Sequence, residues 1–85
     1  MAVVRLRGPL ETLAGGPEHR VDGATVNEVL QGLEREHAAL EGWILDERGT
    51  IRQHINVFVS AEPATAETPV GADERIEILP AISGG

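Results

Sequence analysis

Apolar and polar residues alternate along several short stretches of this chain, as they do in strands that have one buried face. The alternation predicts strands at residues 2–7, 51–59 and 75–79, of which 51–59 is the longest. Residues 18–21 are few and mostly polar, which suits an edge strand because charge discourages pairing with other molecules. The connection at residues 8–17 begins with Gly-Pro and ends with Gly-Gly-Pro, and both are typical of turns.

The pattern changes to helical spacing between the second and third predicted strands. Thr25 and Glu28 fit a capping box, in which each side chain accepts a hydrogen bond from a backbone N–H at the helix start. The apolar residues that follow recur on one side of a helix: Val26, Val29, Leu30 and Leu33. We expect one helix of about eleven to thirteen residues. Gly32 lies inside this helix, where glycine lowers helix stability by up to about 1 kcal/mol relative to Ala. Either a neighbouring element packs closely against this position, or the domain simply tolerates the loss of stability.

This order of elements predicts an α+β domain in which a mixed sheet of four to five strands packs on one main helix. Two strands, a capped helix and two or three further strands fit the β-grasp, or ubiquitin-like, arrangement. We assign residues 1–79 to this domain and residues 80–85 to a flexible C-terminal Gly-Gly tail. Leu10 and Leu13 are expected to tuck the first connection against the core.

A sheet with one main helix leaves its other face uncovered. The alternation places Phe58 and Leu79 on that face, near Val3. Exposed apolar residues commonly mark a surface for a partner. The alternative is that loop residues such as Trp43 fold over them.

Composition and charge exclude several classes of function. With 85 residues, 41% hydrophobic and 25% charged, the chain has the composition of one folded domain. No apolar run approaches the roughly 20 residues that span a bilayer, and the first residues lack a signal peptide's features, so we expect a cytoplasmic protein with no membrane partner. The net charge of -7 argues against direct binding of nucleic acid. The chain has no Cys and no Lys, which excludes thiolate and Schiff-base chemistry.

Residue types that carry catalysis or bind metals are scattered along the chain. His19, His37 and His54 fall on three different predicted elements, without the spacing of metal ligands. Ser83 has no base nearby in the sequence, so a role as nucleophile is not supported. We therefore expect no metal site, no stably bound cofactor and no enzyme activity of the chain's own.

The last residues form a thin stem that ends in two glycines. Glycine lets the backbone enter a narrow channel and adopt the φ angles that the channel imposes. A stretch of about five residues beyond the last strand reaches on the order of 17 Å. This tail can deliver a carboxylate into the active site of another protein, although a small-residue tail without function is the plain alternative.

Four stretches, taken in order, resemble the MoaD/ThiS family of ubiquitin-like sulfur carrier proteins. They are residues 23–30, 54–59 and 71–80 and the final Gly84-Gly85. The resemblance covers nearly the whole chain and is closest to cysteine-type and general thiocarboxylate carriers. Ser60-Ala61-Glu62 departs from the Asn-Gly-type turn of the family, and Ala72 replaces the glycine of a Gly-Asp pair.

The resemblance implies a role as a protein cosubstrate. The carboxylate of Gly85 would be adenylated by a ubiquitin-activating-type enzyme that uses ATP and Mg²⁺, and then converted to a thiocarboxylate. That group would donate sulfur to an acceptor enzyme in the biosynthesis of cysteine, thiamin, a thiolated metabolite or tRNA. Gly85 would be the reacting residue, and the residues that contact partners would be Phe58, Leu79, Ile82, Ser83 and Gly84.

Two other functions fit the same sequence. The small subunit of molybdopterin synthase, which acts in molybdenum cofactor biosynthesis, shares the tail and forms a stable complex with a large catalytic subunit. A ubiquitin-like tag would be joined through Gly85 to lysines of target proteins, and a plain interaction module would leave the tail idle. Co-purification with a large subunit favours the first, and lysine-linked adducts favour the tag.

Overall fold

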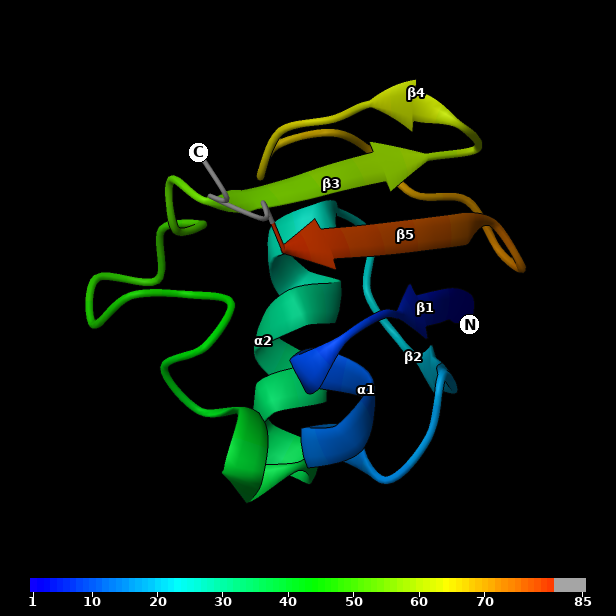
Figure 1. The fold of residues 1–85 in the computed structure, drawn as a ribbon. Coiled ribbons are helices and arrows are strands. Elements are labelled where there is room, and N and C mark those ends of the chain that lie inside the picture. Colours follow the sequence, from blue (N-terminus) through cyan, green and yellow to red (C-terminus); the bar gives the residue numbers. More distant parts are fainter. Residues whose placement is uncertain (81–85) are drawn as a thin grey trace.

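The computed structural model describes residues 1–80, which form one mixed sheet and one long helix (Figure 1). The elements in chain order are β1 (Ala2–Leu6), α1 (Pro9–Ala14), β2 (Glu18–Val21), α2 (Val26–Glu36), the 3₁₀ turn η1 (Ala38–Leu40), β3 (Ile55–Val59), β4 (Glu62–Pro63) and β5 (Arg75–Pro80). The sheet has the order β2-β1-β5-β3-β4. β1 and β5 are parallel, and the other neighbours are antiparallel. The predicted α+β architecture, a five-stranded mixed sheet on one main helix, is confirmed.

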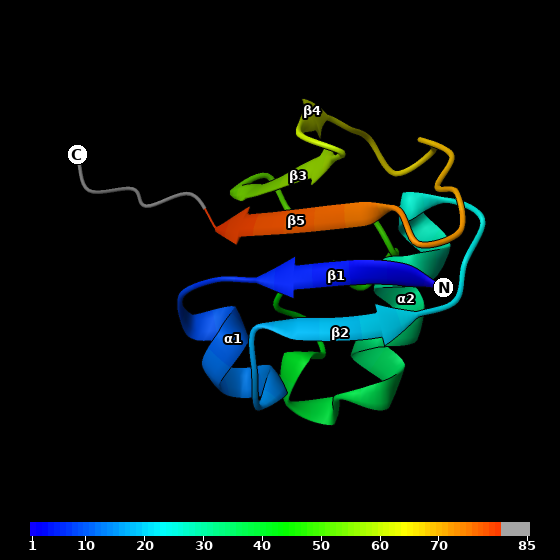
Figure 2. The ribbon, with the colours of Figure 1, turned by 90° about the vertical axis from the view of Figure 1, so that its right-hand side faces the viewer.

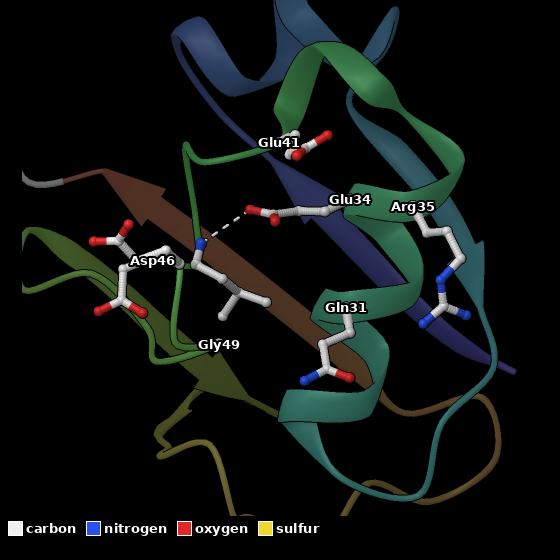
Figure 3. A pocket seen from close by; sticks show the side chains of 8 residues that line it. Gln31, Glu34, Arg35, Glu41, Asp46 and Gly49 are labelled. Carbon is white, nitrogen blue, oxygen red and sulfur yellow. Dashed lines mark hydrogen bonds between the residues drawn. The ribbon is translucent and has the colours of Figure 1, made fainter.

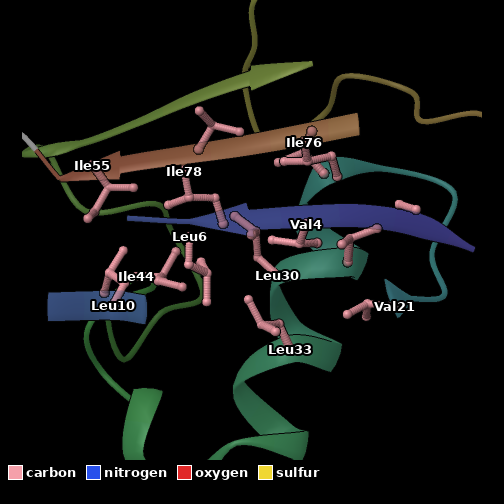
Figure 4. Packing of buried hydrophobic residues seen from close by; sticks show 14 of the residues in the cluster. Val4, Leu6, Leu10, Val21, Leu30, Leu33, Ile44, Ile55, Ile76 and Ile78 are labelled. Carbon is pink, nitrogen blue, oxygen red and sulfur yellow. The ribbon is translucent and has the colours of Figure 1, made fainter. Parts of the chain in front are cut away.

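The core lies between the sheet and α2 (Figure 4). Alternate residues of the central strands point toward the helix and are buried, as the pattern predicted: Ala2, Val4 and Leu6 in β1, Ile55, Val57 and Val59 in β3, and Ile76 and Ile78 in β5. The helix contributes its apolar side: Val26, Val29, Leu30 and Leu33. No polar or charged side chain is buried within residues 1–80. Nor does either helix in this part have the length and apolar character needed to cross a membrane.

The start of α2 forms the predicted capping box. The backbone N–H of Glu28 donates to Thr25 Oγ1 at 3.3 Å, and Glu28 Oε1 accepts from the backbone N–H of Ala24 at 3.0 Å. The helix then runs for 11 residues. Gly32 is explained by close packing, because a Cβ there would lie 3.0 Å from Val21 Cγ1 of β2.

Two predictions about the connections are wrong. The third strand begins at Ile55 instead of residue 51. Ile51 makes only an isolated bridge to Leu45, and the chain then turns because the N–H of Ile55 donates to the carbonyl of Arg52 at 3.0 Å. The first connection contains the helix α1, whose Leu10 is buried. The expectation that Leu10 covers the core is therefore confirmed, but the expected irregular connection is a short helix.

Candidate functional site

α2 covers one face of the sheet, and the opposite face is turned toward the viewer in Figure 2. We call this surface the open face. It consists of outward residues of all five strands, together with Arg7 just after β1: Glu18 and Arg20 in β2, Val3 and Arg5 in β1, Arg75, Glu77 and Leu79 in β5, Asn56 and Phe58 in β3, and Pro63 in β4.

Of the five predicted contact residues, the two that the structure describes, Phe58 and Leu79, lie on the open face. Phe58 pairs with Glu77, and Leu79 pairs with Asn56, so the two apolar side chains lie diagonally across β3 and β5. Both are half-buried. Val3 shares the face but is not next to them, because its partner on β5 is Arg75. The apolar patch is therefore Phe58 and Leu79, and Val3 lies among arginines.

Trp43 does not cover the open face. It lies in the loop between η1 and β3, and 46% of its surface is exposed. This loop is fastened to α2, on the opposite side of the sheet. Glu34 of α2 accepts hydrogen bonds from the backbone N–H groups of Ile44 and Leu45 at 3.1 and 2.9 Å, and Asn27 donates to the carbonyl of Gly49 at 3.0 Å. The alternative in which Trp43 shields Phe58 and Leu79 is wrong.

The last described residue, Pro80, is held firmly at the end of β5. It pairs with Ile55 of β3. On its other side is Gly8, whose φ of 62° favours glycine and whose added Cβ would lie 3.7 Å from Pro80 Cγ. Arg7, next to Gly8, forms an ion pair with Glu77 at 3.7 Å. The predicted site residues Ile82, Ser83, Gly84 and Gly85 lie outside the described residues.

A shallow hollow lies between α2 and the loop that follows it (Figure 3). Several carboxylates line it, among them Glu34, Glu41, Asp46 and Glu47. Glu34 is already occupied by two backbone N–H groups, and Asp46 Oδ1 accepts from the N–H groups of Arg48 and Thr50 at 2.9 and 3.0 Å. These hydrogen bonds hold the pKa of the Asp46 carboxyl below its ordinary value, the one from Thr50 most strongly. The Glu34 and Asp46 carboxylates therefore hold the backbone of the loop in place.

The histidines provide no metal site in the part of the chain that the structure describes. His19 of β2 and His37 at the end of α2 do meet, with ring centroids 4.5 Å apart, and His54 lies elsewhere before β3. This contact could not be read from the sequence because the two residues are eighteen positions apart on different elements. Within residues 1–80, no three His, Asp or Glu side chains converge as metal ligands.

Comparison with known proteins decides the family. A protein-family model described as the ThiS family matches residues 4–85, almost the entire chain. The chain belongs to the ThiS family.

Individual relatives of this ThiS-family chain are similar along their full length. Small archaeal modifier protein 1 of Haloferax volcanii is 33% identical over 84 residues, covering 95% of this chain and 97% of that protein. The crystal structure of the same modifier protein superposes with a TM-score of 0.90 at 32% identity, covering 99% of this chain and 98% of that one. A chain in the crystal structure of the BexX/CysO complex from Amycolatopsis orientalis superposes with a TM-score of 0.87 at 30% identity, covering 100% of this chain and 100% of that one. The protein is thus a β-grasp member of a family of ubiquitin-like small modifiers and sulfur carriers.

The two departures from the ThiS-family pattern fall on turns that nevertheless form. Ser60 and Ala61 connect β3 to β4 with φ angles of 49° and 70°, the positive values that a two-residue type I′ hairpin requires. In the turn before β5, Asp73 adopts the positive φ of 62° beside Ala72. Asp tolerates this conformation better than most residues do. The positive φ angles of both turns are therefore adopted by residues other than glycine.

Glu74 joins these two turns. Its Oε1 accepts from the backbone N–H of Gly71 at 2.8 Å, and its Oε2 accepts from Ser60 Oγ at 2.8 Å. Both hydrogen bonds favour the ionised carboxylate, so the pKa of Glu74 lies below its ordinary value of 4.5, with the bond from Gly71 the larger cause. The carboxylate therefore contributes stability above pH 4.5 that is lost as the pH falls through the lower folded-state pKa.

Glu74→Gln tests this linkage. We expect the variant to be less stable than the wild type at neutral pH, and the difference to shrink as the pH is lowered beneath 4.5, because the wild-type carboxylate is then protonated as well. Urea unfolding across this pH range measures it. Glu67→Gln, at an exposed position in the same segment, is the matched control and should show no such convergence. A difference that stays constant with pH would contradict the assignment.

Proposed function

We propose that this protein is a sulfur carrier whose Gly85 carboxylate is activated and converted to a thiocarboxylate. The single observation that supports this most is the match of a ThiS-family model to residues 4–85, which includes both terminal glycines. The proposed donor role serves the biosynthesis of cysteine, thiamin, a thiolated metabolite or tRNA. The chain acts as a protein cosubstrate and is not itself an enzyme.

The chemistry proposed for the tail needs groups that a partner supplies. A carboxylate is a poor electrophile, so one of its oxygens first attacks the α-phosphorus of ATP, and pyrophosphate leaves. Hydrosulfide then attacks the acyl carbon, AMP leaves, and loss of the sulfur-bound proton gives the thiocarboxylate. Mg²⁺, ATP and the sulfur source belong to a ubiquitin-activating-type enzyme. Because Gly84 and Gly85 have no side chains, nothing crowds the carboxyl carbon at which the reaction is proposed to occur.

The open face is the proposed docking surface for that enzyme. Phe58 and Leu79 offer half-buried apolar surface next to the strand that leads to the tail. β5 pairs with β1 as far as Ile78 and with β3 as far as Pro80. A partner bound to Phe58 and Leu79 therefore has a fixed starting point from which to receive the remaining residues. Ile82, Ser83 and Gly84 are proposed to line the partner's channel.

Intact-mass spectrometry tests the proposal directly. The protein is incubated with the activating enzyme of its host, ATP, Mg²⁺ and sulfide. We expect a mass gain equal to the exchange of one oxygen for sulfur, and no gain when ATP is omitted. An unchanged mass, with an activating enzyme that is competent on another carrier, would reject the sulfur-carrier function.

One observation favours a second candidate function. The Haloferax volcanii relative at 33% identity is named a small archaeal modifier protein, so conjugation of Gly85 to other proteins is a further possible use of the same tail. The chain contains no lysine, so copies of it cannot form side-chain-linked polymers with one another. Tryptic peptide mapping of host proteins distinguishes this function from sulfur transfer. Because Arg75 is the last basic residue, a modified lysine would carry residues 76–85 as its remnant.

A further inference from the structure

Charge is unevenly distributed between the open face and the rest of the molecule. Four of the seven arginines lie on the open face, whereas only two of the fourteen acidic residues, Glu18 and Glu77, do so. The remaining surface therefore carries three arginines against twelve carboxylates. A chain with a net charge of -7 thus presents one face with a positive balance. An acidic partner is attracted only when it approaches from this side.

The four arginines of the open face differ in whether a carboxylate of the same chain lies beside them. Arg5 lies between Glu18 on β2 and Glu77 on β5, each paired with it in register. Arg7 forms the ion pair with Glu77 at 3.7 Å. These two arginines therefore have carboxylates of the same molecule beside them. They are poorly suited to be the main contacts of a partner.

Arg20 and Arg75 have a different environment. Both pair with Val3, Arg20 from β2 and Arg75 from β5, so the two flank one apolar residue on the open face. Both are exposed, and within residues 1–80 neither makes an ion pair. Strands are spaced about 4.8 Å apart, which puts the two Cα atoms roughly 10 Å from each other. We call these two residues with Val3 the arginine pair.

The arginine pair lies at the end of the sheet opposite to Pro80. It is level with the first residue of β5, whereas the apolar patch of Phe58 and Leu79 is nearer the last. In Figure 2 this is the end at which the N-terminus lies. A partner that covers the whole open face would meet the apolar patch near the tail and the arginine pair at the far end.

We propose that the arginine pair binds carboxylates of the adenylating partner and thereby orients the chain so that its tail faces the partner's active site. This inference rests on the proposed function. Arginine binds carboxylates through paired N–H donors, which adds direction as well as attraction. Charges at the margin of an interface act chiefly on the rate of association and on its salt dependence. The arginine pair thus sets which face docks, and the chemistry at Gly85 is left unchanged.

A charge-reversed carrier tests this inference. Arg20→Glu with Arg75→Glu is compared with the wild type in ATP–pyrophosphate exchange catalysed by the host activating enzyme, with KM and kcat for the carrier measured separately. We expect KM to rise about tenfold or more, a typical effect of lost electrostatic steering, with kcat unchanged. Added salt should raise the wild-type KM and have much less effect on the variant.

The matched control is Arg35→Glu with Arg48→Glu. Both residues are exposed and lie away from the open face, and the net charge changes by the same amount. We expect this control to keep its KM within about twofold of the wild type, because its open face is unaltered. Thermal unfolding of each variant verifies that the fold is retained. Phe58→Ser, measured alongside, reports the apolar contact alone, and an unchanged KM would remove Phe58 from the interface.

The outcomes separate the inference from the proposed function. If the wild-type chain supports no exchange, the sulfur-carrier function fails, and this inference fails with it. If the wild type is active but both charge-reversed carriers show the same KM, whether raised or not, the arginine pair has no special role. Only a rise confined to Arg20→Glu with Arg75→Glu supports the proposed orientation.

Discussion

Removal of Gly85 is expected to abolish activation of the tail. One residue accounts for up to about 3.3 Å of chain reach, so deleting Gly85 shortens the tail by that amount. Adding an alanine after Gly85 lengthens the tail equally and introduces a side chain. Misplacement of reacting groups by about 1 Å already costs on the order of a hundredfold in rate. We therefore expect both variants to lose about a hundredfold or more in ATP–pyrophosphate exchange and to gain no sulfur by intact mass.

Gly16→Ala is the matched control for these tail variants. Gly16 lies in the turn before β2, and a Cβ there meets no atom within 4 Å. This variant should be adenylated like the wild type. If the protein without Gly85 acquired sulfur as fast as the full chain, the reacting group would not be the Gly85 carboxylate and the mechanism would have to be replaced.

Leu30→Ala should lower the stability of the fold strongly. The Leu30 side chain is completely buried between the helix and the sheet, so its truncation removes apolar contacts and leaves a cavity. Such changes cost about 2–5 kcal/mol, against a total of roughly 4–13 kcal/mol for a domain of this length. Urea unfolding measures the loss, and thermal unfolding should show a midpoint lowered by about 4–8 °C per kcal/mol.

The neighbouring Gln31→Ala serves as the comparison. Gln31 is exposed on the next position of the same helix, so its truncation should change the unfolding free energy by less than about 0.5 kcal/mol. Equal losses for Leu30→Ala and Gln31→Ala would mean that α2 does not pack on the sheet in the orientation described.

The helix and strands that were predicted correctly are those in which the spacing of apolar residues agrees with local signals such as a helix cap. In α2 the capping box at Thr25 and the apolar spacing from Val26 to Leu33 point to the same boundaries. In β1 and β5 the alternation extends over the complete strand, and Ile76 and Ile78 are buried as expected. Where two independent signals coincide, one sequence is enough to define the element.

The errors arise where contacts distant in the sequence determine the structure. Residues 51–54 alternate like a strand, but the bridge between Ile51 and Leu45 and the turn at Arg52 take them out of the sheet. α1 has only six residues between two glycine-containing turns, too few for a helical period to be recognised. The local pattern of apolar and polar residues shows neither that Ile51 pairs with Leu45 nor that Leu10 packs into the core.

The candidate site was predictable to a similar extent. Alternation was sufficient to put Phe58 and Leu79 on the open face, because each strand's faces follow from its own sequence. The arginine pair was not predictable, since it depends on the register of β1 with two neighbours that come from opposite ends of the chain. Only that register places Arg20 and Arg75 on either side of Val3, on the same face of the sheet.

The parallel pairing of β1 with β5 has a practical consequence for labelling. Val3 is level with Arg75 and Leu6 with Ile78, and the carbonyl of Met1 accepts a hydrogen bond from the N–H of Asp73 at 2.9 Å. Met1 therefore lies at the end of the sheet where β5 begins, and Pro80 lies at the end where it stops. An affinity handle or fluorescent domain fused ahead of Met1 is attached a full strand length from Pro80. The same fusion placed after Gly85 would occupy the carboxylate that is proposed to react.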